Sequence, residues 1–91
     1  MLASRRGTLR HPKFEDCVSR LSKVIPNARE IIDGAVWEIE HDPTRFGTFI
    51  RDIGVWEVRL ERPPLLIFYS LSSRRFVHML TMISSDGKLV F

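Results

Sequence analysis

The chain has 91 residues, 44% of them hydrophobic and 27% charged, and this composition excludes an intrinsically disordered protein. No apolar run approaches the roughly 20 residues that cross a bilayer, and no apolar segment follows the first basic residues as in a secretory signal peptide. The single cysteine, Cys17, excludes an internal disulfide and fits a reducing compartment. We therefore expect one cytoplasmic domain, residues 1–91, with no membrane segment.

The formal net charge of +3 is unevenly distributed along the chain. Residues 1–13 hold four bases and no acid, residues 14–44 hold three bases and seven acids, and residues 45–91 hold seven bases and four acids. We expect a basic arm at residues 1–11, acidic helices, and a basic second half that could face a polyanion. The alternative is an arm and scattered strand-end arginines that are simply solvated.

Apolar residues at helical spacing predict two helices. In the first they stand at positions 14, 17, 18, 21, 24 and 25, with Pro12 in the first turn and Pro26 after the end. In the second they stand at positions 28, 31, 32, 35, 36 and 39, and Pro43 closes the segment. We expect a helical hairpin over residues 12–42, with Trp37 in the core.

After Pro43 the hydrophobic period changes from helical to alternating. Strands are expected at residues 48–52, 55–61, 65–71 and 76–83, with further short ones at 8–10 and 88–91. Short polar turns between successive strands are typical of an antiparallel meander, here over residues 47–91. The predicted fold class is α+β, with the two-helix hairpin packed on a twisted antiparallel sheet of about four strands.

The usual catalytic and metal motifs are absent: the sequence has no Gly-rich phosphate loop, no nucleophile elbow and no cluster of Cys or His. We therefore expect no metal and no cofactor. The remaining candidates are strand-borne polar residues: Arg51, Glu57, Arg59, Tyr69, Arg74, Arg75 and His78. Arginines on one sheet face can hold phosphates, and a histidine can act as acid or base. The alternatives are a structural histidine, a core tyrosine and solvated turn arginines.

Four stretches of the sequence carry a family pattern. They are His41-Asp42-Pro43-Thr44-Arg45-Phe46-Gly47, Val55-Trp56-Glu57-Val58-Arg59-Leu60, Leu66-Ile67-Phe68-Tyr69 and Phe76-Val77-His78-Met79-Leu80. With the order of elements, over roughly residues 14–91, they resemble the RelE/ParE superfamily of type II toxins. The resemblance implies a helical hairpin on a twisted antiparallel sheet and a small antitoxin that wraps the toxin. RelE-like members cleave mRNA in the ribosomal A site without metal, whereas ParE-like members act on DNA gyrase.

The resemblance, together with the basic residues of the second half, predicts roles for particular residues. Arg59 falls at a basic strand position and is the expected catalytic contact to the scissile phosphate. Further catalytic candidates are His78 and Lys88. The expected nucleic-acid contacts are Arg51, Arg74, Arg75 and Phe91.

Several positions depart from the nuclease pattern. Glu57 and Leu66 stand where RelE-like nucleases have bases, Asp86 replaces a base, and Phe91 replaces a tyrosine. Three interpretations therefore stay open. The chain is a toxin and a ribosome-dependent mRNA endoribonuclease, or it is a gyrase-targeting or catalytically degenerate toxin-fold protein that acts by binding. The third interpretation is a small homodimeric interaction domain that associates through the apolar strand at residues 65–71.

Overall fold

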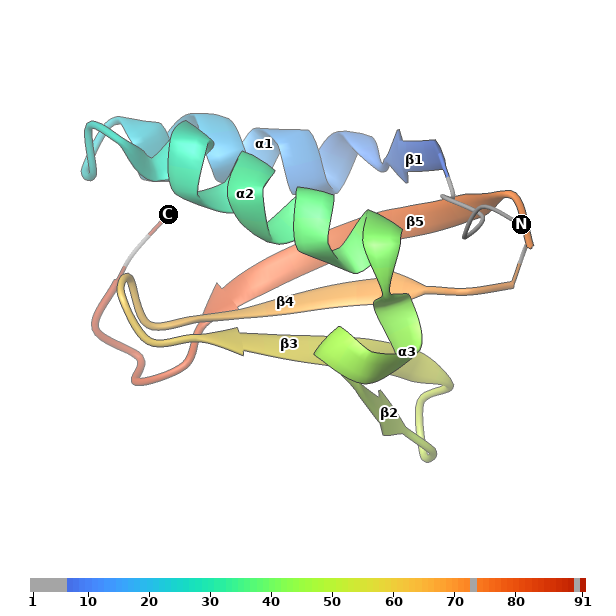
Figure 1. Cartoon of the computed structure of the whole chain (residues 1–91). Helices are drawn as coiled ribbons and strands as arrows, with labels where there is room; N and C mark the ends of the chain where they lie inside the picture. The colour runs from blue at the N-terminus through green and yellow to red at the C-terminus, as the bar shows by residue number, and fades with distance from the viewer. Residues whose placement is uncertain (1–6, 73, 90) are drawn as a thin grey trace.

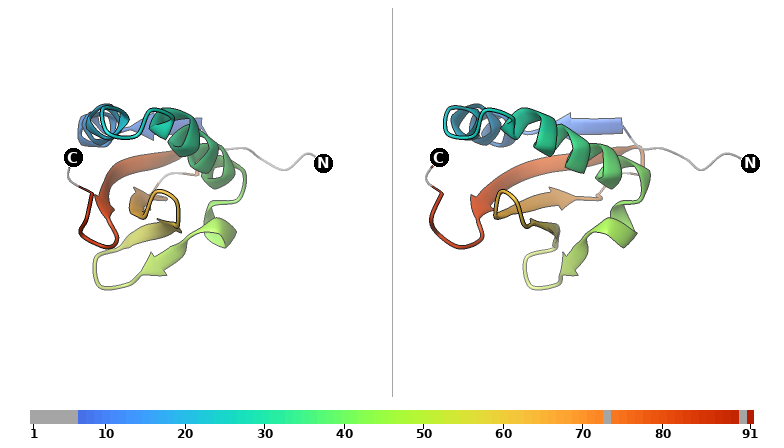
Figure 2. Two further views of the ribbon diagram at one scale, coloured as in Figure 1. Left: turned by 90° about the vertical axis from the view of Figure 1, so that its left-hand side faces the viewer. Right: turned by 60° about the vertical axis from the view of Figure 1, so that its left-hand side comes forward.

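The structure is a computed structural model that describes residues 7–72, 74–89 and 91. Its elements are β1 (Gly7–Arg10), α1 (Pro12–Ser22), α2 (Ala28–His41), α3 (Pro43–Phe46), β2 (Thr48–Ile50), β3 (Val55–Leu60), β4 (Leu65–Ser70) and β5 (Phe76–Ser84). The helices α1 and α2 lie side by side over a twisted sheet (Figure 1; Figure 2). This arrangement confirms the predicted α+β class. No helix in the described part of the chain is long and apolar enough to cross a membrane.

The sheet has five strands, in the order β1-β5-β4-β3-β2. From β2 to β5 it is the expected antiparallel meander. The short strand expected at residues 8–10 is also present, as β1, but it pairs in parallel with β5, with Gly7 opposite Phe76 and Arg10 opposite Met79. The sheet is therefore mixed, and β1 joins the four strands of the predicted meander as a fifth.

The segment after β5 turns instead of forming the strand expected at residues 88–91. Asp86 accepts hydrogen bonds through Oδ1 from Ser84 Oγ (3.0 Å) and from the backbone N–H of Lys88 (2.9 Å). Side-chain bonds of this kind compete with strand pairing. Lys88 and Leu89 are not in a strand, and Val90 lies outside the described residues.

One face of the sheet, the covered face, packs against the helices. On β4, Leu65, Ile67 and Tyr69 are fully buried, as alternation predicts for one face of a strand. The helices contribute the buried residues Phe14, Val18, Leu21, Ala28, Ile32, Ala35, Val36 and Ile39. Burying each of the larger of these side chains contributes about 1.5–3 kcal/mol, so the contact between the two layers is the main source of stability.

A bulge in β5 adjusts the covered face. Phe68 pairs with Thr81, but the next residue of β4, Tyr69, pairs with Met79, and Leu80 is the extra residue between them. Because of this extra residue, Met79 and Met82 both reach the core although they stand three positions apart. Simple alternation along β5 could not have predicted that arrangement.

The prediction that Trp37 lies in the core is wrong, because its side chain is 52% exposed. Val36 and Ile39 take the core positions on this part of α2. Each residue of a helix is rotated by about 100° from the one before, so Trp37 points outward. There its ring stacks on that of His41, with 3.8 Å between the ring centroids.

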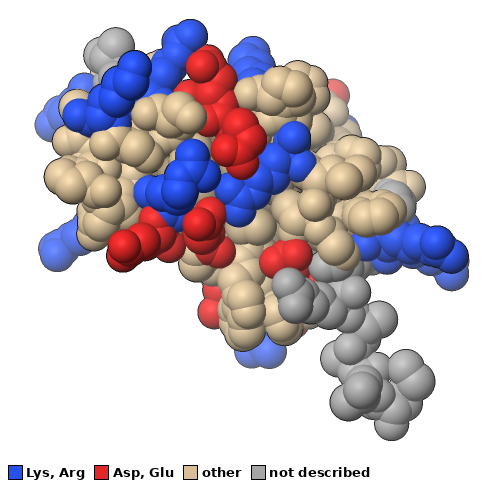
Figure 3. All heavy atoms as spheres, turned by 90° about the horizontal axis from the view of Figure 1, so that it is seen from above, with Lys and Arg blue, Asp and Glu red and all other residues tan. Residues whose placement is uncertain are grey.

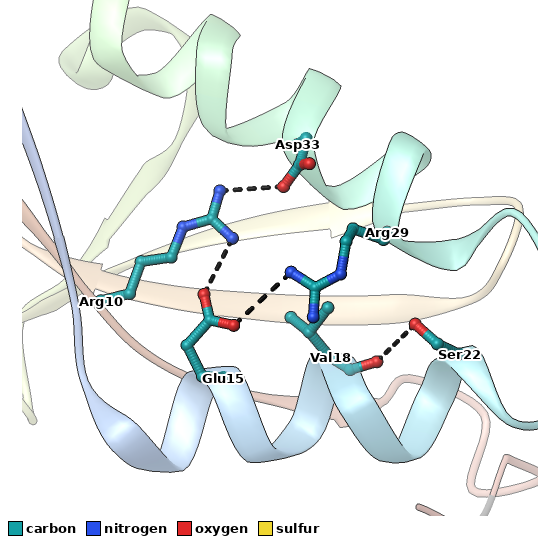
Figure 4. A network of polar contacts seen from close by, with 6 residues as sticks. All are labelled: Arg10, Glu15, Val18, Ser22, Arg29 and Asp33. Carbon is teal, nitrogen blue, oxygen red and sulfur yellow. Dashed lines mark hydrogen bonds and ion pairs between the residues drawn. The ribbon is translucent and has the colours of Figure 1, made fainter.

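Ion pairs tie β1 to both long helices (Figure 4). Arg10 donates to Glu15 of α1 (3.0 Å) and to Asp33 of α2 (2.9 Å), and Arg29 lies 3.5 Å from Glu15. Burial lowers the pKa of the Arg10 guanidinium, but the hydrogen bonds to Asp33 and Glu15 outweigh it and raise the pKa above its ordinary value. Arg10 is thus a structural cation that joins three elements.

The basic arm predicted at residues 1–11 therefore divides in two. Its second part forms β1 and the N-cap of α1, where His11 Nδ1 accepts a hydrogen bond from the backbone N–H of Lys13. Arg5 and Arg6 lie outside the described residues. Seen from above, the helical layer carries charges of both signs close together (Figure 3).

Candidate functional site

The second face of the sheet, the open face, carries three of the seven polar residues singled out in the sequence, Glu57, Arg59 and His78. Residues directly opposite each other on neighbouring strands share a face. The strand pairing therefore defines two rows on β3, β4 and β5 of this face. The first row is Glu57, Phe68 and Thr81, and the second is Arg59, Leu66 and Ile83. All six are half-buried or exposed, in contrast to the buried residues that alternate with them.

Arg59 lies where the sequence predicts, exposed on the open face. Its neighbour across the strands is Leu66. Glu57 lies on the same face two residues earlier, a spacing of roughly 6.5–7 Å along a strand. A phosphate group bound to Arg59 would therefore lie near the Glu57 carboxylate and the apolar side chain of Leu66. Neither of these two neighbouring positions supplies a second basic side chain.

His78 also lies on the open face, half-buried between Leu9 of β1 and Ser70 of β4. It is far from Arg59, however. The two are separated by four residues along β4 and two strand spacings, which corresponds to roughly 16 Å between their backbones. Arg59 and His78 are therefore not neighbours on the open face.

The other predicted residues near the C-terminus lie elsewhere. Lys88 is exposed in the turn after β5, at the end of the sheet opposite Arg74 and Arg75. The backbone N–H of Lys88 bonds to the Asp86 carboxylate, and this bond holds the pKa of Asp86 below its ordinary value. Phe91 is partly buried and packs against the core, at the chain end beside the long helices (Figure 1). Its ring is engaged in packing and is not displayed for stacking on a base.

Three predicted nucleic-acid contacts do gather at one end of the sheet. Arg51 lies in the turn between β2 and β3, and Arg74 and Arg75 lie in the turn between β4 and β5. In an antiparallel meander these two turns emerge at the same end, roughly 10 Å apart. All three arginines are exposed, and Asp52 is the acid next to them. We call Arg51, Arg74 and Arg75 the basic end.

Tyr69 is a core residue, which is the alternative that the sequence left open for it. Its hydroxyl donates to the backbone carbonyl of Pro43 in α3. A side chain at position 47 would collide with the Tyr69 hydroxyl and ring, so only glycine fits there. Burial, together with the nearby carboxylate of Asp42, raises the pKa of Tyr69 to about 12. This tyrosine therefore holds α3 in place and stays protonated near neutral pH.

Sequence reasoning missed one surface feature, an open hollow where α2 meets α3. It is lined by Glu38, Asp42, Arg45 and Phe46. Its signal in the sequence was the Asp-Pro pair that ends α2 and starts α3 at once. Among the described residues, no group of three or more His, Cys, Asp or Glu side chains could hold a metal ion.

A scan of the sequence against models of known protein families finds no match, and a search of curated proteins finds none either. Comparison with solved structures finds the toxin–antitoxin complex RelBE2 from Mycobacterium tuberculosis, with a TM-score of 0.72 and 14% sequence identity. The match covers 89% of this chain and 99% of the chain in that complex. The chain thus has the RelE-like fold that the sequence resemblance predicted.

Proposed function

We propose that this chain is the toxin component of a type II toxin–antitoxin pair, covered in its resting state by a small antitoxin protein. The observation that carries the proposal is the likeness in fold to almost the whole of one chain in the RelBE2 toxin–antitoxin complex. Exposed apolar side chains on the surface add support, because such surface is typical of a protein that meets a partner. They include Val24, Trp37, Phe46, Phe49 and Ile53.

The test is expression of the chain from a tightly controlled promoter. We expect growth arrest by the chain alone, and recovery when the small reading frame next to its gene is expressed with it. The two products should then purify together. Normal growth in cells that contain the folded chain, as judged by circular dichroism of the purified protein, would overturn the proposal.

The activity that we propose for this toxin is metal-independent cleavage of mRNA on the ribosome. The Arg59 guanidinium is exposed and could donate two hydrogen bonds to a phosphate. It would stabilise the charge that develops as a ribose 2′-hydroxyl attacks the phosphorus and the 5′-oxygen of the next nucleotide leaves, with water accepting the hydroxyl proton and protonating the leaving oxygen. The basic end would hold phosphates elsewhere on the strand. His78, roughly 16 Å from Arg59, would contact a different nucleotide from the one that is cleaved.

The test compares Arg59→Ala with Arg62→Ala, a matched control that removes an exposed arginine from the turn between β3 and β4. During arrest by the wild type or by Arg62→Ala, primer extension should reveal new 5′ ends within mRNA codons. Arg59→Ala should lower their yield at least about 100-fold, the usual effect of losing one charge-stabilising donor. Intact mRNA in arrested wild-type cells excludes this activity.

A second candidate is a toxin that acts by binding, on DNA gyrase or on another protein. The observation that favours it is the composition of the open face, where the acid Glu57 lies beside Arg59. Lys88 lies in the turn after β5 and Phe91 packs against the core, so neither adds to this face. Here Arg59→Ala would keep the growth arrest and mRNA would stay intact. Inhibition of supercoiling by the purified chain would then identify gyrase as the target, and unaffected supercoiling would point to another protein.

A further inference from the structure

The open face carries an acid and a base on β3, with apolar side chains opposite them on β4. Within the described residues, no ion pair engages Glu57 or Arg59, although other acids and bases of the chain are paired. On the same face Ile83 is 49%, Leu9 45% and Phe76 37% exposed. Exposed apolar side chains beside complementary charges are typical of a surface that is covered by another protein.

We propose that the open face is an interface between two copies of this chain, packed sheet on sheet. The proposal is separate from the toxin function, because it concerns how the free chain associates with itself. Its basis is that the face is complementary to itself. The first row offers Glu57, Phe68 and Thr81, and the second offers Arg59, Leu66 and Ile83, in the same strand order.

A two-fold axis brings these rows together. The axis lies between the two sheets, runs across the strands, and passes at the level of Val58, midway between the rows. The first row of each copy then faces the second row of the other. Glu57 meets Arg59 of the second copy, and the symmetry makes this ion pair twice. Sheets that pack face to face lie about 10 Å apart with their strands nearly aligned, which long side chains on both faces can span.

The same rows supply apolar contacts beside the ion pairs. Phe68 of β4 would cover Leu66 of the second copy, and Ile83 of β5 would cover Thr81. An axis along β3 would instead place Arg59 against Arg59, which is repulsive, and an axis along β4 would place Arg59 against Ile83, without an ion pair. The proposal therefore specifies one orientation of the second copy.

The structure also decides between the face and an edge of the apolar strand. The sequence left open whether strand 65–71 would associate through an edge or a face. β4 lies inside the sheet with β3 and β5 on its two sides, so its backbone groups are already paired. Of that strand only the open-face side chains, such as Leu66 and Phe68, remain available to a second copy.

The proposed dimer covers Arg59, so the mRNA contact proposed above would be made by the monomer. A second copy matches the acid and the base at the centre of the face more closely than RNA does. The centre of the face has one acid and one base, so it offers no net positive charge to a phosphate backbone. The basic end lies beyond this centre and stays outside the proposed contact.

The experiment is sedimentation velocity of the purified chain over a range of concentrations. The wild type should form a dimer. Arg59→Glu and Glu57→Arg should each raise the dimer dissociation constant at least tenfold, since each places like charges in contact. The double variant Arg59→Glu/Glu57→Arg should return the constant to within a few-fold of the wild-type value. Arg62→Glu, which reverses a charge in a turn outside the face, is the matched control and should leave it unchanged.

Two outcomes overturn the proposal. One is a wild type that stays monomeric at every concentration, and the other is a double variant no better than the single ones. Far-UV circular dichroism checks that each variant is folded, and Ile83→Lys, which removes an apolar contact without touching either charge, gives a second route to a monomer. Sedimentation does not depend on growth arrest, so a harmless chain that dimerises would refute the toxin proposal alone.

Discussion

The two faces of the sheet, made by alternate residues of the same strands, differ in almost every physical property. On β4, Ile67 is fully buried against the helices, and its neighbour Leu66 is only half-buried on the open face. The covered face is apolar and closely packed, and the open face mixes charges with aliphatic side chains. The comparison indicates that the covered face determines the fold, while the open face is free to carry function without affecting stability.

The largest expected effect tests this division with one residue type on both faces. Ile67→Ala should lower the free energy of unfolding by about 2–5 kcal/mol, because it leaves a cavity in the core. Ile83→Ala, on the open face, should change it by about 0.5 kcal/mol or less in the monomer. Urea unfolding at low protein concentration measures both. Similar losses for the two variants would show that the open face also contributes to the fold.

A smaller and more specific effect concerns Tyr69 on the covered face. It is the only tyrosine of the chain, so absorbance near 295 nm reports its ionisation alone. In the folded protein the pKa should be about 12, raised by burial and by Asp42, against about 10 for the unfolded chain.

The sign of the stability effect follows from this difference. The folded state favours the protonated phenol, so its contribution to stability is complete below pH 10. It is lost between pH 10 and pH 12, where only the unfolded chain ionises readily. A midpoint near 10 in the folded protein would contradict the burial of this hydroxyl.

The smallest expected effect concerns the charges above the covered face. Arg10→Ala removes two ion pairs and should cost about 1–2 kcal/mol of unfolding free energy, because the guanidinium is largely enclosed and its two acidic partners lose their donor. Arg20→Ala is the matched control. It removes one exposed pair, with Asp16 on the same helix, and should cost about 0.5 kcal/mol or less. Thermal unfolding of both variants in low and high salt measures the two losses. Equal losses of unfolding free energy would show that the ion pairs of Arg10 stabilise the fold no more than one exposed pair does.

The buried, covered face of the sheet could be predicted from the sequence better than the open face. Alternation along β3 and β4 and the helical spacing of apolar residues reflect burial, so both helices and four strands of the meander could be predicted. The pattern failed at Trp37, an apolar residue that lies on the outward side of its helix. It failed again at Leu80, where a bulge interrupts the alternation along β5.

The candidate site was harder to predict because it depends on register across several strands. Alternation correctly placed Arg59 on the outward side of β3. Its distance from His78 depends on how β3, β4 and β5 are aligned, and no local pattern contains that information. The packing of Phe91 against the core depends in the same way on where the turn after β5 sends the chain.

The parallel pairing of β1 with β5 has a consequence for how the molecule assembles. The first strand of the fold to be synthesised finds its partner in the last, with Gly7 opposite Phe76, so this pair has almost the largest sequence separation in the chain. Contacts of such separation form late and slowly. A nascent chain that has not yet released β5 from the ribosome therefore lacks a docking strand for β1, and β1 joins the sheet only after β5 has been synthesised.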